Sequence, residues 1–254
     1  MRFRDRNGEY GRATRSEVIN TTVDYQVDGK AFQGHLLYRR GATPGRGLLM
    51  APNFFGVTER ALDQAEQLLD DDSVIFVFDP FGVEGRPQTP EQAMAAMGAL
   101  REDNDALRAR LAEALAVLTR EAGALGVPAD RLAAFGFCFG GVCVLELARA
   151  GADLRAFVSF HGLLDTPRPA AGPIKGAVLV LNGADDPMVS DESLVAFKKE
   201  MDAVNADWQL THFGGAVHSF TAPNADMPGR AMYDAKVARR AFAAMDDLFD
   251  EVFG

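Results

Sequence analysis

The sequence predicts a single α/β domain built on a mostly parallel, doubly wound sheet with an N-terminal antiparallel hairpin. Strand-like and helical segments alternate after the first 40 residues, which is typical of parallel sheets with right-handed crossovers. The chain has 254 residues, of which 48% are hydrophobic and 24% charged, as in an ordinary globular domain. We expect one domain over residues 1–254, with residues 1–16 as a loosely ordered arm.

Each predicted element has its own pattern. Residues 17–28 and 32–38 alternate between apolar and polar and flank Gly29-Lys30, which predicts the hairpin. Further strands are expected over residues 47–51, 73–78, 131–137, 156–159, 177–181 and 208–213. Helices are expected over residues 58–69, 89–122 with a break near Gly98, 191–204 and 230–253. Thr89-Pro90 is a helix start, with an N-cap threonine and proline at the first helical position.

Charge and cysteine content exclude several functions. The formal net charge of −10 argues against binding to a nucleic-acid backbone, which needs clustered lysine and arginine. The first residues carry charge without a following apolar run, so we expect neither a signal peptide nor a membrane partner. Two cysteines cannot make a disulfide framework and have no zinc-ligand spacing nearby, which suits a cytoplasmic protein without a metal.

The most informative motif is Gly136-Phe-Cys138-Phe-Gly140-Gly141, which joins an apolar strand to a helix. This spacing is typical of a nucleophile elbow, with cysteine in place of serine, because the glycines permit a strained turn and close strand–helix packing. The helix N-terminus favours the reactive thiolate. The alternative is that Cys138 is a buried, inert residue. We expect Cys143, inside the helix, to be of that inert kind.

The general base is expected downstream of Cys138, because this fold orders its triad along the chain as nucleophile, acid, histidine. His212 alternates with apolar residues in a strand, so we expect it to pack. His218 follows the last strand in a glycine-bearing loop, where open α/β sheets place their sites, and it is the predicted base. His161 ends another strand, and we predict that it binds substrate at the pocket wall or lies just behind the site.

For the acid, the segment Asn182-Gly-Ala-Asp185-Asp186-Pro187 follows a strand. We predict that Asp185 accepts the second N–H of His218, which fixes the tautomer of the ring. Asp186 is better suited to an Asx turn before Pro187. Asp165 is a weaker candidate.

Acyl transfer also needs two N–H donors for the developing oxyanion. We predict that the backbone amides of Phe139 and Phe54 supply them. Asn53, beside Phe54, either orients the substrate or thiol or caps its own loop.

Taken together, the cysteine elbow, the Gly-Ala-Asp-Asp loop and the Val-His-Ser-Phe loop resemble the dienelactone hydrolase family over residues 17–252. The resemblance implies an α/β-hydrolase fold without a large lid domain, and a triad of Cys138, Asp185 and His218. It also implies no metal or organic cofactor, a monomer or weak homodimer, and hydrolysis of small esters or lactones.

The sequence departs from that family in two places. Family members commonly have glutamate where this chain has Asn53, so thiol activation must rely more on His218. Known dienelactone enzymes hold the substrate carboxylate with two arginines. In this chain Thr221 and Ala222 follow His218-Ser-Phe, so one of the two arginine positions has no arginine. Arg86 either matches the other arginine or is a solvated loop residue. Two alternatives remain: a catalytically weak ligand-binding or regulatory member, and a redox protein using Cys138 and Cys143.

Overall fold

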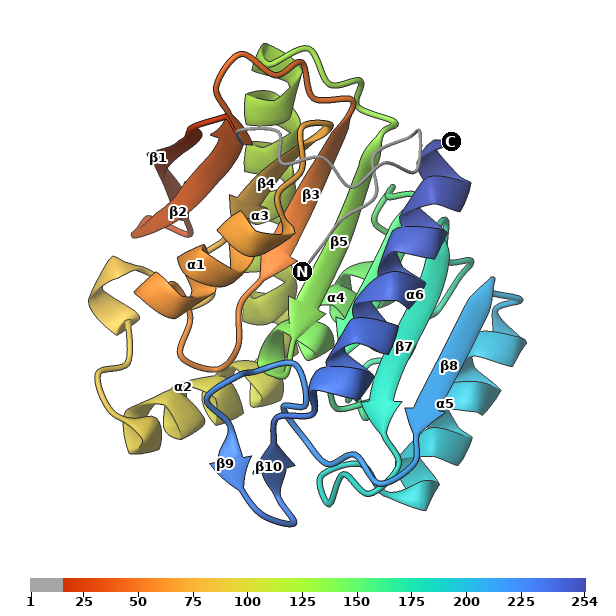
Figure 1. The fold of residues 1–254 in the computed structure, drawn as a ribbon. Helices are drawn as coiled ribbons and strands as arrows, with labels where there is room; N and C mark the ends of the chain where they lie inside the picture. The colour runs from red at the N-terminus through yellow and green to blue at the C-terminus, as the bar shows by residue number, and fades with distance from the viewer. Residues whose placement is uncertain (1–15) are drawn as a thin grey trace.

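The structure, a computed structural model, describes residues 16–254, so all but Ser16 of the predicted N-terminal arm lies outside the described residues. An eight-stranded sheet in the order β1-β2-β4-β3-β5-β6-β7-β8 runs through the molecule (Figure 1). The fold class predicted from the sequence is confirmed.

The N-terminal hairpin consists of β1 (Val18–Val27) and β2 (Lys30–Arg39), paired antiparallel. Its turn residues Asp28 and Gly29 have φ of 49° and 74°. Two consecutive positive φ angles are the geometry of a type I′ turn, whose twist matches that of the strands. β2 then pairs antiparallel with β4 and joins the hairpin to the main sheet.

Six strands form the parallel part of the sheet: β3 (Arg46–Ala51), β4 (Ser73–Val77), β5 (Leu132–Phe137), β6 (Ala156–Phe160), β7 (Ala177–Gly183) and β8 (Trp208–Phe213). Strands β4, β5 and β6 are buried at every position, because helices cover both faces. This burial accounts for their continuous apolar runs. The edge strand β8 is not fully covered, and His212 is exposed on it, so the prediction that His212 packs is wrong.

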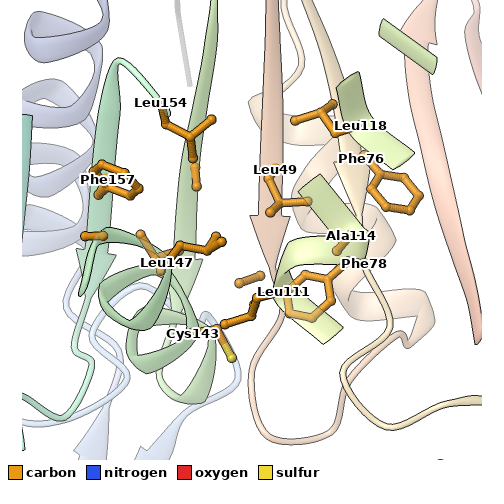
Figure 2. Close-up of a cluster of buried hydrophobic side chains, with 14 of the residues drawn as sticks. Leu49, Phe76, Phe78, Leu111, Ala114, Leu118, Cys143, Leu147, Leu154 and Phe157 are labelled. Atoms are coloured by element: carbon orange, nitrogen blue, oxygen red, sulfur yellow. The ribbon is translucent and has the colours of Figure 1, made fainter. Parts of the chain in front are cut away.

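Helices α1 (Glu59–Leu68) and α6 (Ala235–Phe253) cover one face, and α3 (Asn104–Ala124), α4 (Phe139–Arg149) and α5 (Asp191–Ala203) cover the other (Figure 1). Figure 2 shows part of the second layer, where Leu111 and Leu118 of α3 face Leu49 and Phe76 of the sheet. Cys143 of α4 lies in this core with none of its surface exposed.

Two helix boundaries differ from the prediction. The long helical segment is divided into α2 (Pro90–Glu102) and α3 at Asp103, whose side chain accepts from the Ala106 amide, and Gly98 lies inside α2. The closing helix begins at Ala235, because the residues before it form a hairpin. That hairpin pairs β9 (Asp226–Met227) with β10 (Ala231–Met232). A short 3-10 helix, η1 (Val83–Gly85), lies between β4 and α2.

The strand order reverses at β3, because β4 lies on one side of it and β5 on the other. The loops that leave β3 and β5 therefore lead to helices on opposite faces and separate at the carboxyl ends of these strands. A reversal of this kind is where open α/β sheets bind ligands. In Figure 1 the β9–β10 hairpin lies beside the same edge. Among residues 16–254, no helix combines the length and apolarity needed to cross a bilayer.

Candidate active site

Cys138 forms the turn between β5 and α4, with φ 57° and ψ −114°. A β-carbon at Gly136 would lie 2.3 Å from the Gly140 carbonyl oxygen, and one at Gly140 would lie 2.0 Å from the carbonyl oxygen of Ala51. Only glycine fits at either position, since real β-carbons do not approach other atoms so closely. The predicted strand–turn–helix geometry around Cys138 is confirmed.

The first turn of α4 presents backbone donors beside the thiol. The amides of Gly141 and Val142 bond to the Cys138 carbonyl at 2.9 and 3.3 Å. The Phe139 amide precedes them, at the first position of the helix, where no carbonyl of the same helix lies one turn earlier. The close approach of Gly140 to Ala51 and Pro52 brings the start of the Phe54 loop to the elbow. This arrangement suits the predicted use of the Phe139 and Phe54 amides, which stays a prediction.

His218 lies on a loop that is held by the β9–β10 hairpin. Its amide donates to the Arg230 carbonyl at 3.2 Å, and its carbonyl accepts from the Met232 amide at 3.0 Å. The residue is only 4% exposed. No pattern in the sequence marks this hairpin, because its two strands of two residues are too short to show alternation.

The acid beside His218 is Asp186, and the prediction of Asp185 is wrong. His218 Nδ1 lies 2.8 Å from Asp186 Oδ2, and the Asp186 carboxylate is fully buried. Asp186 Oδ1 accepts from the Met188 amide at 2.9 Å, so the same carboxylate also makes the Asx turn expected of it. Asp185 is exposed, and the weaker candidate Asp165 pairs with Arg101 at 2.6 Å.

The protonation of His218 is set by these neighbours. Burial alone lowers the pKa of His218, but hydrogen bonding to Asp186 and Cys138 and the charges of both outweigh it and raise the pKa to about 9. Nε2 is buried and has no partner of full hydrogen-bond geometry among residues 16–254, while the Cys138 sulfur lies close enough to affect its protonation. Such contacts often tighten only when substrate binds.

His161 lies behind the thiol. Its Nδ1 accepts from the Cys138 amide at 3.1 Å, and its Nε2 lies 2.8 Å from the Thr221 hydroxyl. Both ring nitrogens are therefore occupied, and the side chain is 2% exposed. The prediction that His161 binds substrate is wrong, and the alternative position just behind the site is correct.

Arg86 has a structural partner rather than a free guanidinium. Its Nε donates to the buried carboxylate of Asp79 at 3.1 Å, and its terminal nitrogen donates to the Gln33 carbonyl at 2.6 Å. Asp79 Oδ1 also accepts from the amides of Phe81 and Gly82, which fixes the loop after β4. A buried carboxylate therefore holds the Arg86 side chain in a structural contact, and a role toward substrate stays a prediction.

Asn53 and Cys143 take the simpler of their predicted roles. The Asn53 side-chain oxygen accepts from the Phe55 amide at 3.0 Å, so the side chain caps its own loop, and a role toward substrate stays a prediction. Burial raises the pKa of the Cys143 thiol well above its usual value. The expectation that Cys143 is an unreactive core residue agrees with its complete burial.

Comparison with known proteins agrees with this architecture. The family model described as "Dienelactone hydrolase family" matches residues 32–253. The solved structure of m3DLH is 38% identical, with a TM-score of 0.85 over 93% of this chain and 99% of that one. A dienelactone hydrolase-like promiscuous phosphotriesterase, P91 from metagenomic libraries, is 35% identical, with a TM-score of 0.84 over the same shares.

A curated relative points the same way. The probable 2-oxo-3-(5-oxofuran-2-ylidene)propanoate lactonase of Bradyrhizobium sp is 26% identical over 210 residues, which cover 78% of this chain and 82% of that protein. With a family match over most of its length and a site of this geometry, the chain belongs to the dienelactone hydrolase family and is a hydrolase that acts on ester bonds.

Proposed function

We propose that this protein hydrolyses small carboxylic esters or lactones through a thioester on Cys138. The observation that carries the proposal is the placement of Cys138, at its strained φ of 57°, beside a histidine whose other nitrogen is held 2.8 Å from a buried carboxylate. A nucleophile, a base and an orienting acid arranged in this way are the parts of a triad.

In the proposed acylation, the Cys138 thiolate attacks the carbonyl carbon, and the carbonyl electron pair moves to oxygen. The amides of Phe139 and Phe54 stabilise this oxyanion. When the tetrahedral intermediate collapses, the C–O bond to the alcohol breaks and the alkoxide takes the proton from His218 Nε2. A thioester forms, and with a lactone the alcohol stays attached to the acyl group.

Deacylation reverses the proton transfer. Neutral His218 takes a proton from water, whose oxygen attacks the thioester carbonyl, and the C–S bond then breaks to release the acid and restore the thiolate. Asp186 holds Nδ1–H throughout and stabilises the imidazolium of each step. The raised pKa of His218 favours its imidazolium form before substrate binds, which places a positive charge beside the Cys138 sulfur. This route needs no carboxylate at position 53.

The surroundings of the thiol favour a small, uncharged substrate. Phe54 and Phe55 are half-buried in the loop that we propose to supply the second oxyanion donor, and their ring centroids are 4.4 Å apart. Aromatic walls of this kind stabilise apolar groups. The positive charge of Arg86 is already balanced by the buried carboxylate of Asp79, which weakens its attraction for a substrate carboxylate. We therefore propose neutral esters and lactones ahead of a carboxylated dienelactone.

The test is a panel of p-nitrophenyl acetate, longer esters and lactones with wild type, Cys138→Ala and Cys143→Ala. We expect Cys138→Ala to lose about 10³-fold or more in kcat, as other triads do, and Cys143→Ala to keep its activity. Turnover that survives in Cys138→Ala would overturn the cysteine mechanism. Absence of turnover, with iodoacetamide modifying Cys138 no faster than a model thiol, would favour a catalytically weak ligand-binding member.

A second candidate activity is phosphotriester hydrolysis, because P91 is described as a promiscuous phosphotriesterase. The thiolate would attack phosphorus and expel an aryloxide, which takes the proton from His218, with the phosphoryl oxygen on the donors proposed for the carbonyl oxygen. Water, deprotonated by His218, would then attack the phosphorylated cysteine, break the P–S bond and restore the thiolate. Paraoxon in the same panel tests this. Multiple turnovers that depend on Cys138 support it, and stoichiometric inactivation without release of a second equivalent of nitrophenol contradicts it.

We further propose that the protein acts in the cytoplasm as a monomer or weak homodimer without a nucleic-acid partner. A net charge of −10 and only two cysteines support this setting. Light scattering of the purified full chain over a concentration series checks the oligomeric state, and a stable larger assembly would contradict it.

A further inference from the structure

We infer that His161 is a positioning residue, which fixes the backbone of Cys138 through Nδ1 and connects it to the His218 loop through Nε2. This inference rests on the proposed function, since it assigns a role to His161 in the same reaction. Four observations carry it: the backbone angle of His161, its two hydrogen bonds and its ring contacts.

His161 follows β6 directly and has a φ of 41°. A residue with a β-carbon adopts this left-handed region only when its surroundings compensate for the strain, which is on the order of 1 kcal/mol or more. The next residue is Gly162, yet the positive φ falls on the histidine. The histidine amide bonds to the Leu181 carbonyl at 2.8 Å, which anchors this backbone to β7. The strained conformation directs the imidazole toward the elbow.

The first contact is with the nucleophile itself. The Cys138 amide donates to both the Phe160 carbonyl at 3.0 Å and His161 Nδ1 at 3.1 Å. His161 Nδ1 therefore holds the backbone N–H of Cys138, the residue that has φ 57° and ψ −114°. A shift of this peptide would move the sulfur relative to His218 and to the Phe139 amide.

The second contact reaches the loop of the base. Because Nδ1 accepts, the proton of the neutral ring is on Nε2, which donates to the Thr221 hydroxyl at 2.8 Å. Thr221 is 4% exposed and lies three residues after His218. The His161 ring also meets the rings of His218 and Phe220 edge-on, with centroids 5.0 and 5.1 Å away. One side chain thus contacts both the nucleophile and the loop of the base.

The role requires a neutral ring. Burial and the neighbouring His218 lower the pKa of His161 well below its usual value. A proton on Nδ1 would remove the acceptor from the Cys138 amide and place a second positive charge beside the imidazolium of His218. His161 therefore keeps the same hydrogen bonds while His218 gains and loses its proton.

Two substitutions at position 161 test the roles of the two ring nitrogens separately. In His161→Asn the side-chain oxygen takes the place of Nδ1 and can still accept from Cys138. In His161→Gln the amide reaches toward Thr221, and the Cys138 amide keeps only the Phe160 carbonyl as its acceptor. We expect His161→Asn to stay within about threefold of wild type in kcat, and His161→Gln to lose about tenfold or more with KM little changed. Equal kcat values in the two variants would overturn the inference.

The exposed His212→Asn serves as the matched control and should leave kcat unchanged. Thermal unfolding of each variant separates loss of stability from loss of kcat. Should both His161 variants fail to fold, Thr221→Ser and Thr221→Val decide: Ser keeps the hydroxyl and should retain kcat, while Val should lose about threefold or more. Equal kcat in this pair would then overturn the inference.

Alkylation of Cys138 by iodoacetamide gives a readout that does not need turnover. It should be slowed about fivefold or more in His161→Gln and little in His161→Asn, because only the first removes the acceptor that positions the thiol. If wild type hydrolyses no ester, the proposed function fails and alkylation still tests His161. If wild type depends on Cys138 but Asn and Gln behave alike, only the role of His161 fails.

Discussion

Asp186 uses its two carboxylate oxygens for different partners, with Oδ1 on the Met188 amide and Oδ2 on His218. The residue pattern makes an Asx turn and a triad acid look like competing roles for neighbouring aspartates. In the folded chain the turn directs the second oxygen at the histidine, so one residue makes both contacts. Asp185 is left facing solvent, because adjacent side chains in this loop point in different directions.

Asp186→Asn should lower kcat by about 10³-fold or more, because an amide can no longer hold the productive tautomer of His218 or stabilise its imidazolium. Asp185→Asn is the matched control one residue away, and it should stay within about twofold of wild type. Steady-state kinetics on p-nitrophenyl acetate measures both. A larger loss in Asp185→Asn than in Asp186→Asn would restore the original prediction.

At the scale of elements, the nucleophile turn depends on three segments that pack at backbone distance. Strand β5 turns into α4 at Cys138, and the first turn of α4 lies against the end of β3 near Ala51 and Pro52. The sequence motif was sufficient to predict the turn, since glycines at this spacing indicate that the strand and the helix pack closely. It could not predict the β9–β10 hairpin that holds His218, because no local pattern marks pairs of this length.

Gly140→Ala should destabilise the protein by about 3 kcal/mol or more and abolish activity, since the new β-carbon would lie 2.0 Å from the Ala51 carbonyl oxygen. Gly98→Ala is the control: it lies within α2 with no atom inside 4 Å of the new β-carbon, and it should stabilise by about 0.5–1 kcal/mol. Urea unfolding gives both values. Similar stabilities for the two variants would contradict the packing argument.

For the whole molecule, the buried site links stability to pH. The pKa of His218 is raised to about 9 in the folded protein, against about 6.5 in an unfolded chain, so folding favours its protonated form. That contribution is fully present below pH 6.5 and is lost as pH rises through about 9. The lowered pKa of His161 acts in the opposite direction and only below about pH 6.5, outside this window.

We therefore expect the free energy of unfolding of wild type, relative to His218→Gln, to fall by roughly 3 kcal/mol between pH 6.5 and pH 9.5. Urea titrations of both proteins at the two pH values measure it. In the same window, kcat/KM should decline above about pH 9 as the imidazolium that protonates the leaving group is lost. A stability difference that stays flat or rises with pH would contradict the assigned protonation state.

The sequence by itself determined the succession of strands and helices in the main sheet, the turn at Cys138 and the position of His218 in a loop after β8, because periodicity and glycine spacing are local properties. The tertiary structure alone decided that Asp186 rather than Asp185 meets His218, that Asp79 holds Arg86, and that His161 contacts the Cys138 amide instead of substrate. Each of these depends on where a side chain points after distant segments pack together. No local pattern carries that information, since residues 32 or more positions apart meet in the triad only through the sheet.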